Sequence, residues 1–84
     1  MIKKFIKENN ITFNEGERNS STVVIIGYAQ HLGLNETQLK KELSKEIKAD
    51  KFIKEEVERL FDYCSSNNYG DWWNTKAAKS QYKF

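Results

Sequence analysis

The spacing of apolar residues predicts a short helix at the start of the chain. Ile2, Phe5 and Ile6 fall on one face of a helix that would cover residues 2–9. The two asparagines that follow interrupt this pattern. The next segment, residues 11–17, has no helical period, so it is expected to form an extended link with a turn at its glycine.

A longer helix is predicted from about Asn19 to Leu32. It contains the four β-branched residues 23–26, which could also form a buried strand. The apolar stripe continues through Tyr28 and Ala29 to Leu32 at helical spacing, however, and this continuation favours a helix. The sequence therefore predicts no sheet in this part of the chain.

The ends of the predicted helices carry capping signals. One of the three polar residues 19–21 is expected to cap the second helix, because a short polar side chain accepts a hydrogen bond from a free backbone N–H group. Gly33 followed by Leu34 is typical of a helix C-terminus. Asn35, with Gln38 three residues later, is a variant of the capping box and predicts the start of a third helix.

Two further helices are predicted from one-sided apolar stripes. Both stripes are flanked by charged residues, and the second ends in the polar run 65–68. The stripe residues are Leu39, Leu43 and Ile47 in the third helix, and Ile53, Val57, Leu60, Phe61 and Cys64 in the fourth.

The C-terminal segment predicts one more short helix. Tyr69-Gly70 is expected to turn, and Asp71 is a plausible N-cap for a helix that holds Trp72, Trp73 and Ala77. The last two residues of the chain are expected to fray.

Composition supports an all-α fold. The 84 residues include no proline and four glycines, and 38% are hydrophobic, which suits one compact core. We therefore predict a small bundle of four to five helices, forming a single domain over residues 1–84. No apolar run is long enough to span a bilayer and no secretory signal is visible, so a cytoplasmic location is expected.

Charge is concentrated at the two ends of the chain. The formal net charge is +2, which is too balanced to identify a nucleic-acid-binding protein. Residues 1–7 carry three lysines and no acid, and residues 71–84 carry three lysines and one aspartate, whereas the middle is slightly acidic. Basic ends of this kind are common sites of anion binding, although many proteins have them for other reasons.

The sequence shows no pattern for catalysis or metal binding. His31 is the only histidine, and its position near a helix C-terminus suits a polar group that favours the helix dipole. Cys64, the only cysteine, falls in an apolar stripe and is expected to be a small buried residue. Glu55, Glu58 and Asp62 share a helical face and could bind a cation, but such faces are usually only solvated. We expect no catalytic residue, no metal and no cofactor.

The adjacent tryptophans Trp72 and Trp73 are the most informative feature. Neighbouring residues of a helix point about 100° apart, so both indole rings cannot enter one core pocket. One ring is expected to pack inward and the other to stay at least partly exposed. An exposed ring among lysines fits single-stranded nucleic acid, a protein interface, or the closing helix of the bundle, and the sequence leaves these three alternatives open. The predicted contact surface comprises Trp72, Trp73, Lys76, Lys79, Tyr82 and Lys83.

Three segments together resemble a known family. The first segment, residues 13–19, reads Phe-Asn-Glu-Gly-Glu-Arg-Asn and precedes a helix. The second, Gly33-Leu34 with residues 35–37, opens a second helix. The third, residues 53–57 (Ile-Lys-Glu-Glu-Val), opens a third helix. Over residues 13–63 this arrangement resembles the primase C-terminal helical module, the PriCT family.

The resemblance implies a role in DNA replication. Gly16, Arg18 and Asn19 match the family's Gly-x-Arg-Asn element position by position, and the similar core would extend over about residues 13–66, followed by the aromatic and basic segment 69–84. Modules of this family accompany primase–polymerase domains and replicative helicases of plasmids, phages and genomic islands, where they assist primer initiation by engaging template or nucleotide. Since no catalytic domain is attached to the module here, a polymerase or helicase would have to act in trans.

Arg18 and Asn19 add a second candidate contact. At a helix start the free N–H groups and the positive end of the dipole favour an anion, and an arginine adds a bidentate donor for phosphate. The alternative is that Arg18 pairs with Glu15 or Glu17 and orients the link.

The sequence therefore predicts a non-catalytic DNA-replication accessory protein, which binds a DNA polymerase/primase or a helicase and assists primer synthesis on single-stranded DNA. The alternative is a small phage or mobile-element protein that acts purely by protein–protein binding, for example as an inhibitor of a defence system. A transcription-type DNA-binding protein is less favoured, because no helix pair carries an obviously basic recognition helix.

Overall fold

The fold is all-α, as the sequence predicts. The computed structural model describes residues 2–14, 16–47, 51 and 53–84, and none of these residues lies in a β-strand. The elements in chain order are α1 (Ile2–Glu8), α2 (Arg18–His31), α3 (Glu36–Glu46), the π-helical turn η1 (Ile53–Val57), α5 (Glu58–Ser66), α6 (Tyr69–Trp72) and α7 (Lys76–Gln81).

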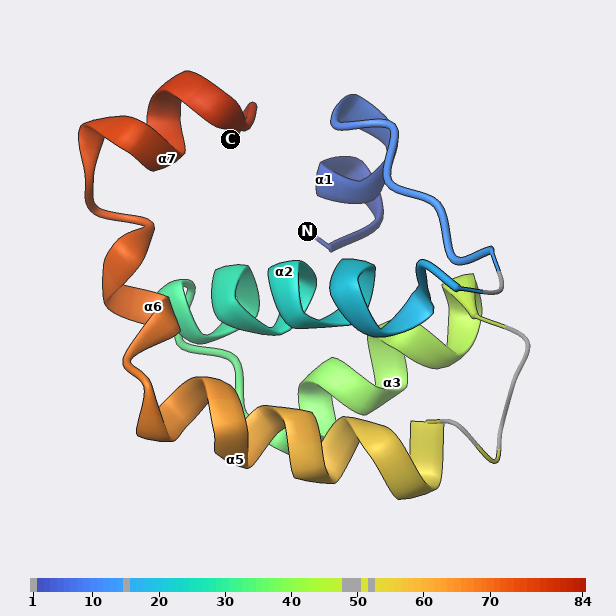
Figure 1. Ribbon diagram of the computed structural model, residues 1–84. Helices are drawn as coiled ribbons and strands as arrows, with labels where there is room; N and C mark the ends of the chain where they lie inside the picture. The colour runs from blue at the N-terminus through green and yellow to red at the C-terminus, as the bar shows by residue number, and fades with distance from the viewer. Residues whose placement is uncertain (1, 15, 48–50, 52) are drawn as a thin grey trace.

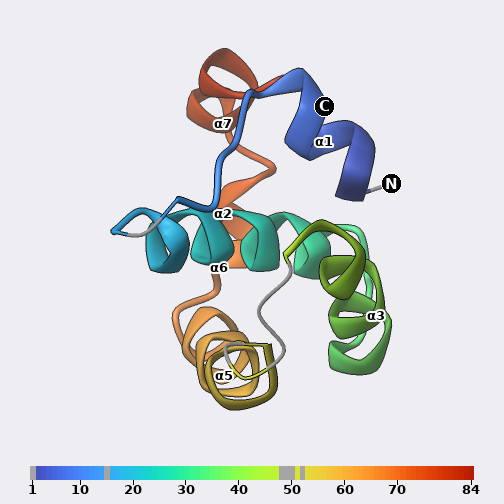
Figure 2. The same cartoon turned by 90° about the vertical axis from the view of Figure 1, so that its right-hand side faces the viewer.

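Helix α2 forms the middle layer of the molecule. Figure 1 shows α1 and α7 on one side of it and α3 and α5 on the other, with α6 passing its C-terminal end to connect the two sides. Figure 2, turned by 90°, shows the same three layers. Because α2 is covered on both sides, its β-branched run 23–26 is helical and partly or fully buried, which confirms the predicted helix.

Two of the four predicted capping signals are confirmed. Gly33 has φ +85°, and the N–H groups of Gly33 and Leu34 donate to the carbonyls of Gln30 and Ala29 at 3.1 and 3.0 Å, which is a Schellman motif. Asn35 and Gln38 form the reciprocal capping box at the start of α3.

The predicted N-cap of α2 is wrong. The helix already begins at Arg18, and Glu17 occupies the N-cap position without a side-chain capping bond. Residues 19–21 are therefore inside the first turn. Ser21 donates its hydroxyl to the Thr12 carbonyl at 2.6 Å, so it anchors the link instead of capping the helix.

The C-terminal segment forms two helices where one was predicted. Helix α6 begins earlier than expected, at Tyr69, and its N-cap is Asn68 in a left-handed conformation (φ 55°), not Asp71. The backbone turns after α6, and Thr75 then caps α7 by accepting a hydrogen bond from the Ala78 N–H at 3.3 Å. This break shifts the buried position from Ala77 to Ala78.

Every described helix except α6 contributes residues to the core, and the contribution of α2 begins at Ile25. Every residue of the two predicted stripes packs into it, with Phe61 only partly buried, whereas Leu32 at the end of the α2 stripe is 37% exposed. The core residues are Ile2, Phe5, Ile6, Ile25, Ile26, Ala29, Leu39, Leu43, Ile47, Ile53, Val57, Leu60, Cys64, Trp73 and Ala78.

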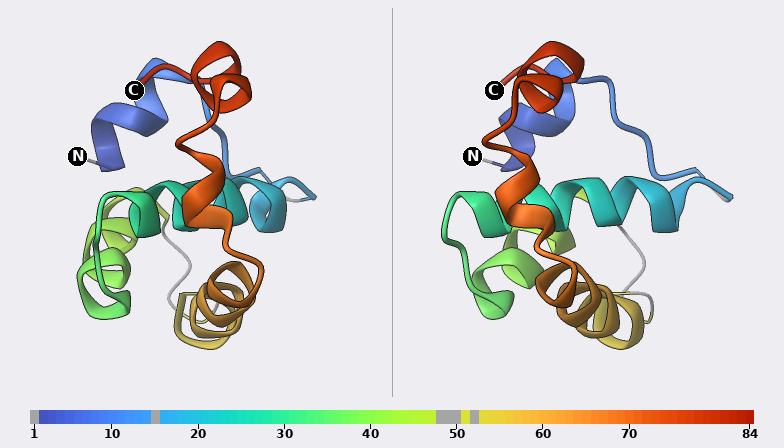
Figure 3. Two further views of the ribbon diagram at one scale, coloured as in Figure 1. Left: turned by 90° about the vertical axis from the view of Figure 1, so that its left-hand side faces the viewer. Right: turned by 60° about the vertical axis from the view of Figure 1, so that its left-hand side comes forward.

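Two glycines allow α6 to lie directly against α2. A Cβ atom at Gly27 would meet the Trp73 Nε1 at 3.0 Å, and a Cβ atom at Gly70 would meet the Gln30 Cβ at 3.2 Å and the His31 backbone nitrogen at 3.3 Å. Figure 3 shows α6 crossing close to α2 in both views. The missing side chains therefore set the distance between the two helices.

The end of the chain is held in place, which corrects the expectation that it frays. The Asn9 side chain accepts a hydrogen bond from the Lys83 N–H at 2.7 Å and donates to the Lys83 carbonyl at 2.9 Å. The Phe84 ring packs edge-on against Trp73 and Tyr28, with centroids 5.2 and 5.6 Å apart. This clasp between Asn9 and Lys83 fastens the end of α1 to the segment after α7.

Within the described part of the chain, every helix is too short or too polar to cross a lipid bilayer.

Gly27→Ala is expected to lower the free energy of unfolding by about 1–2 kcal/mol, because the new methyl group collides with the buried Trp73 indole. A decrease in the free energy of unfolding would be informative, since an alanine in a helix is otherwise about 1 kcal/mol more favourable than a glycine. Urea denaturation measures the effect. The Trp73→Phe background is the control, because a smaller ring leaves room for the methyl group and the cost of Gly27→Ala should shrink there. A Gly27→Ala protein as stable as the parent would contradict the close packing.

Asn9→Ala is expected to cost about 1–2 kcal/mol, since it removes both hydrogen bonds of the clasp. Hydrogen exchange at the Lys83 amide should become faster at the same time. Asn14→Ala is a matched control, because Asn14 is an exposed asparagine of the link whose side chain makes no hydrogen bond within the described residues. Equal exchange rates in the two variants would show that the clasp does not hold the tail.

Candidate functional site

An aromatic groove lies between α2 and the C-terminal helices. It has a volume of about 420 Å³ and is closed on one side by α2 and on the other by α6 and the end of α7. Its lining is uncharged, and it combines aromatic rings with three side-chain amides. The residues are Val23, Val24, Gly27, Asn67, Asn68, Tyr69, Trp72, Trp73, Gln81 and Tyr82.

One of the two tryptophans is buried and the other is exposed, as the sequence predicts. Trp73 is only 2% exposed and packs among the rings of Phe5, Tyr28 and Tyr82 at centroid distances of 5.0–5.4 Å. Trp72 is 37% exposed and stands perpendicular to Trp73, with ring centroids 5.1 Å apart. Trp73 is thus a core residue that offers only the floor of the groove, while Trp72 presents its ring to solvent.

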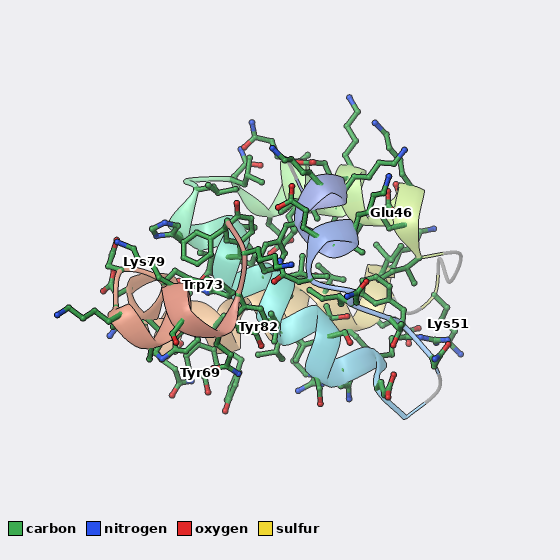
Figure 4. The ribbon with its side chains drawn as sticks, turned by 90° about the horizontal axis from the view of Figure 1, so that it is seen from above. Glu46, Lys51, Tyr69, Trp73, Lys79 and Tyr82 are labelled. Atoms are coloured by element: carbon green, nitrogen blue, oxygen red, sulfur yellow. The ribbon has the colours of Figure 1, made fainter. Side chains whose placement is uncertain are left out.

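Two tyrosines complete the aromatic walls. Tyr82 lies 6.2 Å from Trp72 in an edge-on arrangement, and Figure 4 shows Tyr82, Tyr69 and Trp73 grouped at the same end of the molecule. The Tyr69 and Tyr63 hydroxyls share a hydrogen bond of 3.3 Å, which together with burial raises the pKa of Tyr69. The Tyr69 hydroxyl therefore stays neutral in ordinary buffers, and the groove keeps its uncharged character.

The predicted lysines do not belong to the groove. Lys76 and Lys79 are exposed residues of α7, and at 100° per residue they lie about 140° and 160° around the helix from Gln81, which lines the groove. Figure 4 shows Lys79 at the outer edge of this end of the molecule. Lys83 is exposed in the tail after α7. The expected contact surface is thus divided into an aromatic groove and a separate lysine face.

Arg18 and Asn19 lie far from the groove. They begin α2, whereas α6 packs at its C-terminal end. Arg18 is partly buried and lines another cavity together with Glu46, which Figure 4 shows at the opposite end of the molecule from Trp73. Asn19 is exposed. The structure therefore does not bring the Gly-x-Arg-Asn element and the C-terminal segment into one site.

The sequence suggested Glu15 or Glu17 as the ion-pair partner of Arg18. The Glu17 carboxylate accepts a hydrogen bond from the Thr12 hydroxyl at 2.7 Å, which orients the link. Glu15, the other expected partner, lies outside the described residues.

A second, polar cavity lies across α6 from the groove. It has a volume of about 530 Å³, and Asn68 lines both cavities. The C-terminal end of α2, the start of α3 and α6 surround it. Its polar lining includes His31, Ser65, Asp71 and Asn74.

The remaining candidates for catalysis or metal binding are either packed against other residues or exposed to solvent. His31 ends α2, where its ring lies 6.4 Å from Tyr28 and 6.0 Å from Phe84. Cys64 is buried, and its thiol points to the Val23 carbonyl at 3.7 Å. Glu55, Glu58 and Asp62 are exposed, and among the described residues no three acidic, histidine or cysteine side chains are placed to hold a metal ion.

Sequence reasoning identified only three of the ten residues that line the groove, namely Trp72, Trp73 and Tyr82. The amides of Asn67, Asn68 and Gln81 belong to it but carry no pattern that marks them. Gly27 was the available signal, because a glycine within an apolar helical run indicates close approach of another segment. Nothing in the sequence indicated that this segment is the one containing the tryptophans.

Comparison of the chain with protein-family models, with curated proteins and with solved structures finds no match. The resemblance to the primase C-terminal module, carried by Gly16, Arg18 and Asn19, remains a prediction from the sequence alone.

The Cys64 thiol is expected to resist alkylation in the folded protein. Burial raises its pKa to about 11, so at pH 8 nearly all of it is the unreactive thiol. Iodoacetamide modification followed by mass spectrometry should be slow in buffer and fast in 6 M urea, a concentration of about the size needed to unfold a small domain. Rapid modification in buffer alone would contradict the packing of α5 on α2.

Proposed function

We propose that this chain is a non-catalytic accessory protein that binds a protein partner in its aromatic groove. The observation that carries the proposal is the exposed Trp72 ring at an uncharged groove whose floor is the buried Trp73. Tryptophan and tyrosine residues at such positions dominate the energy of protein interfaces. A volume of about 420 Å³ is large enough for an apolar side chain or two from a partner.

The division between groove and lysines favours a protein over single-stranded DNA as the occupant of the groove. A strand whose bases stack on aromatic rings needs cationic side chains along the same path, since each nucleotide carries a phosphate. Among the residues that the structure describes, no charged one lines the groove, and Lys76 and Lys79 project from another side of α7. The lysine face remains free to meet DNA when a partner brings a template close to it.

The partner class follows from the resemblance of residues 13–63 to the primase module. We propose that the partner is a DNA polymerase/primase or a replicative helicase, and that the complex assists primer synthesis on single-stranded DNA. A purely inhibitory protein would use the same groove, so the two functions differ in the partner and not in the surface.

Binding and primer synthesis test this function together. The chain is mixed with the purified replication polymerase, primase and helicase encoded in the same genome, and affinity is measured by biolayer interferometry. One of them is expected to bind and to yield more primers in the presence of the chain. If none binds, the replication role is wrong, and loss of primers on binding would instead favour an inhibitor.

Trp72→Ala is expected to weaken that complex by roughly 30-fold or more, because it removes the exposed ring at the centre of the surface. The double variant Lys76→Ala/Lys79→Ala is the control and should change affinity by no more than about threefold, since charges outside the desolvated centre contribute little. Circular dichroism should show that both variants remain helical. Full binding by Trp72→Ala would rule out the groove.

Direct DNA contact has a separate signature. If α7 meets phosphates, the lysine variant should lower the slope of log affinity against log salt for a fluorescent single-stranded oligonucleotide by up to about one unit per lost contact. Trp72→Ala should leave this slope unchanged. The opposite result, with Trp72 required for DNA binding, would restore a nucleic acid as the occupant of the groove.

A further inference from the structure

The polar cavity beside the groove is organised differently from it. Helix α6 separates the two: Tyr69 and Trp72 face the groove, whereas Gly70 and Asp71 line the polar cavity. Four consecutive residues therefore serve two sites of opposite character. Asn68 lines both, so the groove and the polar cavity adjoin at the start of α6.

The electrostatic character of the polar cavity is negative. Asp71 is the only charged residue among the described residues that line it when His31 is neutral. The Asp71 carboxylate is exposed, and within the described part of the chain it has neither a hydrogen bond nor an ion pair. Gln30 and His31, at the C-terminal end of α2, also line the cavity, and this is the negative end of a helix dipole.

The remaining lining includes residues with acceptor oxygens and one aromatic residue. Ser65 and Asn74, whose side chains carry such oxygens, line the cavity together with Asp71 and Phe61. Gln30 does not compete for these acceptors, because its amide already donates to the Phe61 carbonyl at 3.0 Å. A planar group with several N–H donors and a face that stacks on aromatic rings is the chemical complement of this lining.

We propose that the polar cavity binds an arginine side chain of the partner whose apolar residue fills the aromatic groove. The inference rests on the proposed function for the identity of the partner, but the recognition itself is a property of this chain. A guanidinium satisfies the lone Asp71 carboxylate through charge-assisted hydrogen bonds, and its remaining N–H groups meet the neighbouring oxygens. The ammonium of a lysine has no planar face for Phe61 and fits the cavity less well.

The chain alone provides the test, with N-acetylarginine methylamide as the probe. The probe is titrated into the ¹⁵N-labelled chain at pH 8 and constant ionic strength, and amide shifts are followed by NMR. We expect saturable shifts at Gly33, Gly70, Asp71 and Asn74 with a Kd on the order of 10 mM, as suits one charge-assisted contact. The neutral citrulline analogue should produce none of these saturable shifts, and the lysine analogue should bind at least threefold more weakly.

Asp71→Asn supplies the matched variant, because it removes the charge and keeps the shape. It should weaken binding of the arginine probe by about tenfold, a size typical of a lost charge-assisted bond. The control Asp62→Asn, an exposed aspartate on α5, should leave the affinity unchanged. Equal shifts with citrulline, equal binding of lysine, or full binding by Asp71→Asn would each overturn the proposal.

The two proposals fail separately. Loss of probe binding leaves the partner assays of the aromatic groove intact. Conversely, a chain that binds the arginine probe but no replication protein would keep the arginine cavity and overturn only the replication role.

Discussion

The close contact between α2 and α6 is the constraint on which the rest of the structure depends. Gly27 and Gly70 remove the side chains that would otherwise hold the two helices apart, and the Trp73 indole lies over Gly27. That position leaves Trp73 buried among Phe5, Tyr28 and Tyr82, so one contact fixes both the C-terminal helices and the aromatic part of the core. A methyl group at either glycine would force the neighbouring atoms of the other helix to move by a few tenths of an ångström.

The same contact creates the candidate site. Because α6 is only four residues long and is pressed against the end of α2, its side chains leave it in two directions. Trp72 borders an uncharged groove, and Asp71 borders a cavity that faces the negative end of α2. Neighbouring residues of one short helix thereby place an apolar and an anionic surface side by side, and under the proposed function a single partner contacts both, which is a compact basis for specificity.

The sequence predicts the regular parts of this fold well because each depends on local rules. The stripe of α3 and the Asn35 capping box are complete within a dozen residues, and the Gly33 C-terminus needs only its own turn. Two errors arose where distant segments meet. The tail was expected to fray, because nothing near Lys83 in the sequence reveals its hydrogen bond to Asn9. The lysines were grouped with Trp72, because the sequence does not reveal the break at Thr75 that turns α7 away from it. The groove itself is formed by long-range packing and leaves little trace in the sequence.

The clasp between Asn9 and Lys83 has a consequence for the order of events during synthesis. Phe5 in the first helix packs against Trp73 and Tyr82, which follow it far along the chain. Helix α1 therefore emerges from the ribosome long before its aromatic partners exist, and closing a loop of this length has an entropic cost that only the finished contacts offset. Helix α1 is made before α6 and α7, but it reaches its final place only after these two helices have been made.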